Sequence, residues 1–329
     1  MQKKYFELGS AKNNILGKKV LENNYDYDDN KYVYDENRKN DGHSAVVRQI
    51  NNNSVVLDIG CASGILGTIL TKYKNCIVDG IEYDKKAYEV CKKKNIYRNL
   101  YNFSISNDKA TEYIKFDKLN LKYDYIIFAD VLEHLANPYE VLANVSKYLK
   151  KDGAIIVCIP NISHIDIIKS IIEGNFNYNR HGILDSTHLR FFTNNSFLDM
   201  IENIESEYNI FFDVKHCERI LFKPPYFDDL NLELFNLDGN LEDYLTLQNV
   251  YKISLTNVKK KKKLDVVKHD DYFEKMLNQY NNMNEELKKL KNDNQILKND
   301  NQELKEELSK IVNSKRWKML NKMLKIVNK

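Results

Sequence analysis

The sequence predicts an α/β fold with a doubly wound, mostly parallel sheet, followed by a long helical coiled coil. Apolar strand-like runs alternate with helix-like stretches over residues 46–160, and the first of these runs passes directly into a glycine turn. Such alternation is typical of a parallel sheet with helices on both faces. From about residue 270, apolar residues recur every seven positions, which predicts the coiled coil.

The first strand and its turn lie in VVLDIGCASGILGTIL, residues 55–70. Residues 55–57 are branched and apolar, as in a strand that is buried on both faces. Asp58 ends this run, and the small residues of GCASG form a tight turn before a helix that begins near Ile65. This arrangement leaves bare backbone at which a ligand can approach. The alternative is a turn that needs glycine only for its backbone angles.

The remaining elements of the domain follow in order. Two helices are predicted, at 84–94 and 137–151. Pro138 stands just inside the start of the second helix and Gly153 follows its end, which are the usual places for these residues. Further strands are predicted at 76–83, 101–106, 123–130 and 153–160, and two late strands at 208–220 and 249–258.

The composition excludes several classes of protein. A net charge of +3 over 329 residues gives no global basic field for nucleic acid. Five scattered cysteines without a CxxC pair argue against a disulfide framework and a zinc site. There is no apolar run of transmembrane length and no signal-peptide core, so we expect a cytoplasmic protein.

The chain divides into five regions. Residues 1–45 are expected to form a polar arm, 46–260 the main domain, 261–270 a basic linker, 271–312 the coiled coil and 313–329 a basic amphipathic helix.

Polar residues follow four strands of the predicted sheet, and the carboxyl ends of such strands are where α/β folds bind ligands. Glu82 comes about 20 residues after the turn, where an acid can accept both hydroxyls of a ribose. Asp108 follows the third strand and either meets an adenine or caps the next helix. Asp130, Glu133 and His134 follow the fourth strand.

The spacing of Glu82 fits either a nicotinamide dinucleotide or S-adenosylmethionine. The turn reads Gly60-x-Ala62-x-Gly64, which differs from the G-x-G-x-x-G of pyrophosphate sites, and no Lys or Arg stands near it to meet a phosphate. S-adenosylmethionine has no phosphate. Asp58 or the carbonyl groups of the turn can accept hydrogen bonds from its ammonium group.

The motifs VLDIGCASG, GIEYD, SND and DVLEHLANP, in this order, resemble those of class I S-adenosylmethionine-dependent methyltransferases. The similarity covers about residues 45–260 and is closest to the branch of quinone and sugar O-methyltransferases associated with bacterial surface-glycan genes. It implies S-adenosylmethionine as cofactor. The residues implied to bind it are Asp58, Gly60, Ala62 and Gly64 at the methionine end, Glu82 at the ribose, Asp108 at the adenine, and Asp130 beyond the fourth strand. Ala62 replaces the middle glycine that is usual in this family, and its methyl group leaves slightly less room for the cofactor.

Methyl transfer to a hydroxyl group needs alignment and a base that takes the proton. His134 is a candidate base, and RHGILDSTHLRFFT, residues 180–193, adds His181 and His188. This segment resembles one from methyltransferases encoded with surface-polysaccharide genes, which implies a lid over the acceptor pocket within residues 161–200. Each histidine could instead be structural. No ligand spacing demands a metal, and none is assigned.

The favoured function is O-methylation of a sugar or sugar phosphate of a bacterial surface polysaccharide or lipid-linked glycan. One alternative acceptor is a quinone or another small molecule, for which a more apolar lid is expected. Another alternative is a non-catalytic scaffold with a degenerate methyltransferase fold. Nucleic acid is not an expected partner, because DVLEH stands where nucleic-acid methyltransferases carry Asn/Asp-Pro-Pro-Tyr.

The tail predicts a parallel two-stranded coiled coil and therefore a homodimer. Asn at two a positions favours parallel, in-register pairing, and acids at g face lysines at e of the partner helix. Position a is occupied by Phe273, Tyr280, Leu287, Asn294, Asn301 and Leu308, and position d by Met276, Met283, Leu290, Leu297, Leu304 and Ile311.

The last helix carries a Trp-led apolar stripe flanked by basic residues. Trp317, Leu320, Leu324 and Val327 share one face. This pattern predicts a helix that lies on an anionic membrane surface, at the inner face of the membrane. The alternative is docking on the dimer mate or on another protein, such as a glycan-assembly protein.

Overall fold

The computed structural model describes residues 32–105, 121–224, 227, 241–259 and 271–327. Internal contacts divide the chain into two units, residues 1–267 and residues 268–329. The first unit contains the sheet, and the described residues of the second are helical except at Ser314.

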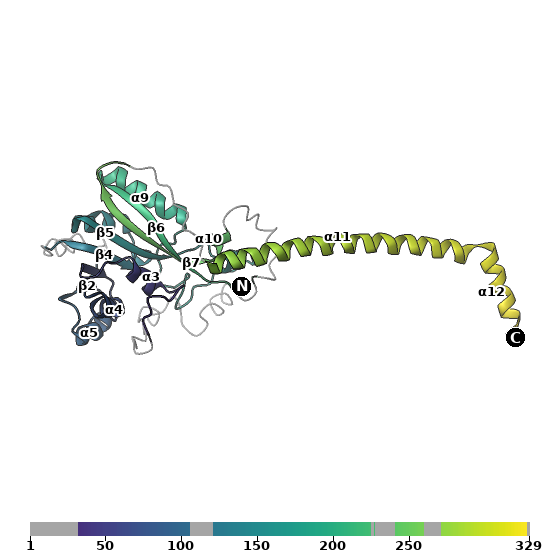
Figure 1. Ribbon diagram of the computed structural model, residues 1–329, viewed down its shortest axis with the longest axis horizontal. Coiled ribbons are helices and arrows are strands. Elements are labelled where there is room, and N and C mark those ends of the chain that lie inside the picture. The colour runs from purple at the N-terminus through teal and green to yellow at the C-terminus, as the bar shows by residue number, and fades with distance from the viewer. Residues whose placement is uncertain (1–31, 106–120, 225–226, 228–240, 260–270, 328–329) are drawn as a thin grey trace. The chain divides into compact units, whose positions relative to one another are not determined.

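The described strands form one seven-stranded sheet in the order β3-β2-β1-β4-β5-β7-β6 (Figure 1). Strands β1 to β5 pair in parallel, whereas β7 runs antiparallel to both β5 and β6. The predicted doubly wound, mostly parallel sheet is confirmed. The strands are β1 (Val55–Ile59), β2 (Ile77–Glu82), β3 (Asn99–Asn102), β4 (Tyr123–Ala129), β5 (Leu149–Pro160), β6 (Phe211–Leu221) and β7 (Thr246–Thr256).

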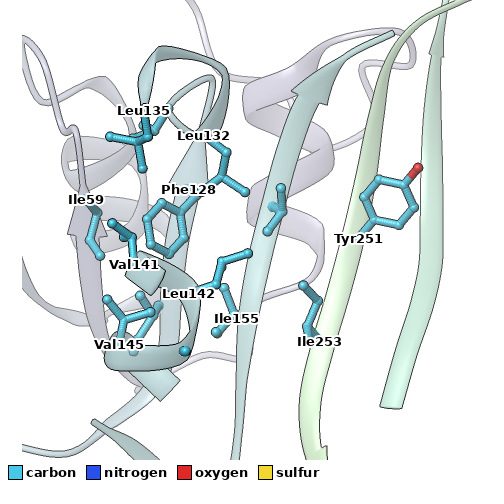
Figure 2. Packing of buried hydrophobic residues seen from close by; sticks show 14 of the residues in the cluster. Ile59, Phe128, Leu132, Leu135, Val141, Leu142, Val145, Ile155, Tyr251 and Ile253 are labelled. Atoms are coloured by element: carbon cyan, nitrogen blue, oxygen red, sulfur yellow. The ribbon is translucent and has the colours of Figure 1, made fainter. Parts of the chain in front are cut away.

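Two apolar clusters cover the two faces of the sheet, because alternate strand residues point to opposite sides. On one face, Val56 and Ile127 pack with helices α3 (Gly42–Arg48) and α4 (Ile65–Lys74). On the other face, Phe128 packs with helices α7 (Pro138–Ser146) and α9 (Asn194–Tyr208). Figure 2 shows this second cluster, with Phe128 among Ile59, Val141 and Leu142. The remaining helices of this unit are α5 (Lys85–Lys94), η2 (Leu132–His134), α8 (Ile165–Ile172) and α10 (Leu241–Leu245).

The boundaries of several elements differ from the predicted ones, and β5, β6 and β7 each begin three or four residues away from the predicted starts. β3 lies at Asn99–Asn102, earlier than the predicted 101–106. Pro138 is in the first turn of α7 as expected, but the helix ends at Ser146, because Leu149 already pairs with Tyr123 of β4. Gly153 is therefore a strand residue and does not end the helix. A short helix, α3, also begins inside the expected polar arm and buries Ala45 and Val46.

The second unit contains α11 (Asp271–Asn313) and α12 (Lys315–Val327). They are separated at Ser314, whose hydroxyl accepts a hydrogen bond from the backbone N–H of Trp317 at 3.2 Å. The d positions Leu290, Leu297, Leu304 and Ile311 are 55–63% exposed in the single chain. Among the described helices, none has both the length and the apolar character needed to cross a membrane.

Candidate active site

A cavity of about 990 Å³ opens at the carboxyl ends of β1, β2, β4 and β5. The turn after β1, the end of β2, the segment after β4 and residues 181–188 line it. No Lys or Arg is among the described residues of the lining, whereas five acids are: Glu82, Asp84, Asp130, Glu133 and Asp185. Such a lining suits a ligand that carries positive charge and opposes one that carries phosphate.

The turn after β1 depends on its small residues. Gly60 has φ of 69°, and a Cβ there would lie 2.6 Å from Val131 Cγ2. Ala62 also adopts a left-handed conformation, with φ of 46°. Both residues line the cavity. Gly64 does not line it; it precedes α4 with φ of 87°, and a Cβ there would lie 2.9 Å from Cys91 Sγ. At Gly64, glycine therefore serves packing against α5.

Asp58 lies below this turn and outside the cavity lining. It is 1% exposed, and its carboxylate accepts a hydrogen bond from the hydroxyl of Tyr97 at 2.8 Å. Burial raises the pKa of Asp58 to about 7. The methionine contact that the resemblance implies for Asp58 stays a prediction. In the structure, Asp58 anchors the tyrosine that packs against Gly67 and Gly80.

Glu82 connects the turn to the start of α5. Its Oε2 accepts the N–H of Ala62 at 2.7 Å, and its Oε1 accepts the N–H of Asp84 at 2.6 Å. Burial raises the pKa of Glu82, and the two N–H donors act in the opposite direction because they favour the carboxylate. Since each oxygen has a second lone pair and the residue lines the cavity, Glu82 can still accept hydrogen bonds from a ligand.

The predicted adenine contact, Asp108, lies outside the described residues. The described residues before it, Phe103, Ser104 and Ile105, line the cavity on the same side as Glu82. An aromatic and an aliphatic side chain at this point provide an apolar wall.

Asp130 follows β4 in a left-handed conformation with φ of 55°. Its Oδ1 accepts a hydrogen bond from Gln248 Nε2 of β7 at 2.6 Å. Asp130 is exposed at the cavity, and desolvation by the protein around it raises its pKa. Sequence reasoning missed Gln248, because the predicted last strand began one residue later.

His134 and His188 lie together in the cavity, with ring centroids 4.7 Å apart. The Thr187 hydroxyl donates to Asp185 Oδ1 at 2.6 Å, so its oxygen accepts the Nδ1–H of His134 at 3.1 Å. His188 Nδ1 lies 2.9 Å from the carbonyl oxygen of Ile183 and donates to it. These hydrogen bonds assign the tautomers and leave Nε2 of each ring as the acceptor.

Both imidazoles are neutral bases in this environment, since burial lowers the pKa of His134 and of His188. The third predicted catalytic residue, His181, lines the cavity from an exposed position. Arg190 does not line it; its guanidinium donates to the carbonyl oxygen of Ala136 at 2.6 Å. Within the predicted lid, residues 181–188 therefore form the cavity wall.

Glu133, one of the polar residues predicted to follow the fourth strand, is a buried acid. It is 1% exposed, and its Oε1 lies 4.0 Å from His188 Nε2. Neither oxygen accepts a hydrogen bond within the described part of the chain. Burial raises its pKa well above the usual value.

Residues 34–205, just over half of the chain, match a protein family described as "Methyltransferase domain". The chain belongs to this family. The predicted S-adenosylmethionine-dependent methyltransferase domain is thereby confirmed. The match includes the turn after β1, Glu82 and the two histidines, so most of the cavity belongs to the methyltransferase domain.

Curated relatives match about a third of this methyltransferase chain. The ribosomal protein L11 methyltransferase of Dictyoglomus turgidum is 33% identical over 125 residues, 37% of this chain and 38% of the relative. The (S)-coclaurine N-methyltransferase of Thalictrum flavum is 29% identical, over 33% of this chain and 29% of the relative. The ubiquinone biosynthesis O-methyltransferase of Glaesserella parasuis is 30% identical, over 31% of this chain and 43% of the relative. The chain thus spans less than half of the length of these relatives.

Solved methyltransferase structures also resemble the chain at low identity. The plantazolicin methyltransferase BpumL, in a complex with SAH and a triazolic substrate analogue, is 18% identical with a TM-score of 0.42, covering 72% of this chain and 90% of its own. A TehB-like methyltransferase of Corynebacterium glutamicum is 15% identical with a TM-score of 0.39, and the match covers 65% of this chain and 87% of that protein.

Proposed function

We propose that this methyltransferase transfers a methyl group from S-adenosylmethionine to a hydroxyl of a sugar in a bacterial surface polysaccharide or lipid-linked glycan. The observation that carries the O-methyltransferase assignment is the pair of imidazoles, His134 and His188, whose acceptor nitrogens remain available at the cavity. The glycan assignment comes from the similarity of residues 180–193 to a segment of glycan-associated methyltransferases.

The cavity fits the cofactor in three respects. Glu82 provides a carboxylate that can accept from the two ribose hydroxyls. The turn at Gly60 and Ala62 offers backbone to the methionine end, with Asp130 beside it as an acceptor for the ammonium group. The acidic lining also suits the positively charged sulfonium, which makes the bound methyl group reactive.

The protein's own residues would align the acceptor and remove its proton. The acceptor oxygen attacks the methyl carbon in line with the C–S bond, the O–C bond forms, and the sulfur keeps the electron pair of the broken bond. His134 Nε2 takes the hydroxyl proton, while Thr187 and Asp185 keep Nδ1 protonated and fix the ring.

Within this proposal a neutral sugar is favoured over a sugar phosphate. A phosphate would have to enter a lining that, in its described part, contains five acids and neither Lys nor Arg. The second candidate acceptor is a quinone precursor or another small phenol, which is favoured by the apolar wall residues Phe103, Ile183 and Leu247.

An acceptor assay with methyl-labelled S-adenosylmethionine distinguishes these candidates. We expect label to enter neutral oligosaccharides or a lipid-linked glycan in preference to sugar phosphates and catechol-type quinone precursors. Transfer to the quinone precursor alone would replace the glycan assignment by the second candidate.

We further propose that the chain is a homodimer through α11. The heptad pattern supports this pairing, and so does the exposure of Leu290, Leu297 and Leu304 in the single chain. Sedimentation equilibrium should give a dimer for the full chain and a monomer for a protein truncated after residue 265. A monomeric full chain would refute the dimer, and a trimer would refute its stoichiometry.

The last helix, α12, is proposed to bind an anionic membrane surface from this dimer. Trp317, Leu320 and Leu324 are 42–55% exposed, and Lys315, Arg316 and Lys318 stand beside them. Two helices held together raise the avidity without any new contact. The full chain should co-sediment with phosphatidylserine vesicles at low salt, whereas a protein ending at residue 312 should not. If the full chain stays in the supernatant, a protein partner replaces the membrane.

A further inference from the structure

The cavity contains a cluster of ligand atoms that the proposed base chemistry does not fully use. Glu133, His134 and His188 each bring one carboxylate oxygen or imidazole nitrogen to the same point, and these three atoms lie within 4.8 Å of one another. All three side chains come from two short segments, the turn after β4 and the end of the predicted lid. The backbone N–H groups of Leu189 and Arg190 both donate to the carbonyl oxygen of Glu133, at 2.7 and 3.0 Å, and hold the two segments together.

Glu133 is the independent sign that a ligand belongs here. Its carboxyl group is 1% exposed, and neither oxygen has a hydrogen-bond partner among the described residues. A buried polar group without a partner is costly, and such groups in native proteins usually bind an ion or water, or act in catalysis. His188 Nε2 lies 4.0 Å from Glu133 Oε1, which is too long for a direct hydrogen bond.

The two histidines are oriented as metal ligands commonly are. A ligating imidazole usually donates its other N–H to a carbonyl or a carboxylate, which fixes the ring and its tautomer. His188 donates to the carbonyl oxygen of Ile183, and His134 donates to Thr187, which in turn donates to Asp185. These hydrogen bonds leave Nε2 as the nitrogen with an available lone pair on each ring.

We propose that Glu133, His134 and His188 bind one divalent first-row transition-metal ion, with open coordination positions that face the cavity. Two imidazoles and one carboxylate are a donor set that suits Zn²⁺, Fe²⁺ and neighbouring ions and leaves positions for water or substrate. A single cation would satisfy both the Glu133 carboxylate and the two nitrogen lone pairs.

The consequence for catalysis rests on the proposed O-methyltransferase function. An acceptor hydroxyl that takes an open position on the ion loses its proton more readily, as metal-bound water does. The proton then passes to water, the oxygen attacks the methyl carbon, and the sulfur keeps the electron pair of the C–S bond. His134 and His188 would in this case position the ion, and neither would accept the proton.

The test is a titration of the chelator-treated full chain with Co²⁺, followed by its visible absorption. We expect one Co²⁺ per chain with a ligand-field spectrum. Glu133→Gln and His188→Ala should weaken binding by at least 100-fold, and Thr187→Val by about 10–100-fold. The matched controls Glu140→Gln and His43→Ala lie outside the cluster and should bind as the unaltered chain does. Thermal unfolding of each variant confirms that it is folded.

Calorimetry with S-adenosylmethionine on the same samples separates this proposal from the proposed function. A chain that binds the cofactor but shows no Co²⁺ spectrum, or binds Co²⁺ equally after Glu133→Gln and His188→Ala, would overturn the metal site. The base assignment of His134 would then remain. A chain that binds Co²⁺ but not the cofactor would refute the methyltransferase proposal and keep the metal site.

Discussion

Replacing either His134 or His188 with alanine is expected to lower turnover by about 10²–10⁴-fold, the usual contribution of a positioned acid or base. The affinity for S-adenosylmethionine should change little, because both rings meet the acceptor side of the cavity beside residues 181–188. Single-turnover methyl transfer measures the change in turnover, and calorimetric titration with S-adenosylmethionine measures the change in cofactor affinity.

Two further histidines serve as comparisons. His181→Ala should have a much smaller effect, since His181 lines the cavity from an exposed position. His43→Ala in α3 is the matched control, because this residue is not in the lining and packs edge-on against Tyr32. Equal losses of turnover and cofactor affinity in the His134 and His188 variants would assign both residues to the cofactor or to the fold.

Replacing Glu82 with alanine is expected to raise the Kd for S-adenosylmethionine strongly. The ribose hydroxyls lose their common acceptor, and each lost hydrogen bond to a charged group is worth about 1.5–3 kcal/mol, or about 10–150-fold in Kd. The turn itself is also weakened, since the N–H groups of Ala62 and Asp84 lose their partner. Calorimetry measures the Kd, and thermal unfolding measures the effect on the turn.

Two variants separate the loss of the ligand contact from the loss of charge. Glu82→Gln keeps one carbonyl oxygen and should give an intermediate Kd. Glu89→Ala removes an exposed acid of α5 close in the sequence and should leave the Kd unchanged. An unchanged Kd in Glu82→Ala would mean that the ribose lies elsewhere in the cavity.

The sequence carried enough information for the sheet, because its strands are local apolar runs and its turn needs residues that tolerate positive φ. β2 and β4 begin and end within one residue of the predicted ends, and β1 begins at Val55 as predicted but continues to Ile59. The boundary of α7 was wrong for a non-local reason, since pairing of Leu149 with Tyr123 decides where the helix stops.

The cavity was less predictable than the fold, because its contacts cross between distant segments. Gln248 reaches Asp130 only through the antiparallel pairing of β7 with β5. The hydrogen bond that the Asp58 carboxylate accepts from Tyr97 likewise joins residues 39 positions apart. The meeting of Glu133 with His188 depends on how residues 181–190 fold over the end of β4, which no spacing along the chain reveals.

The central claim is that the cavity beside Gly60 and Glu82 binds S-adenosylmethionine. Calorimetric titration of the full chain with S-adenosylmethionine tests this most directly. We predict saturable binding of one cofactor per chain, weakened in Glu82→Ala and retained in Glu89→Ala. The absence of binding at millimolar cofactor, with a chain shown to be folded, would contradict the account.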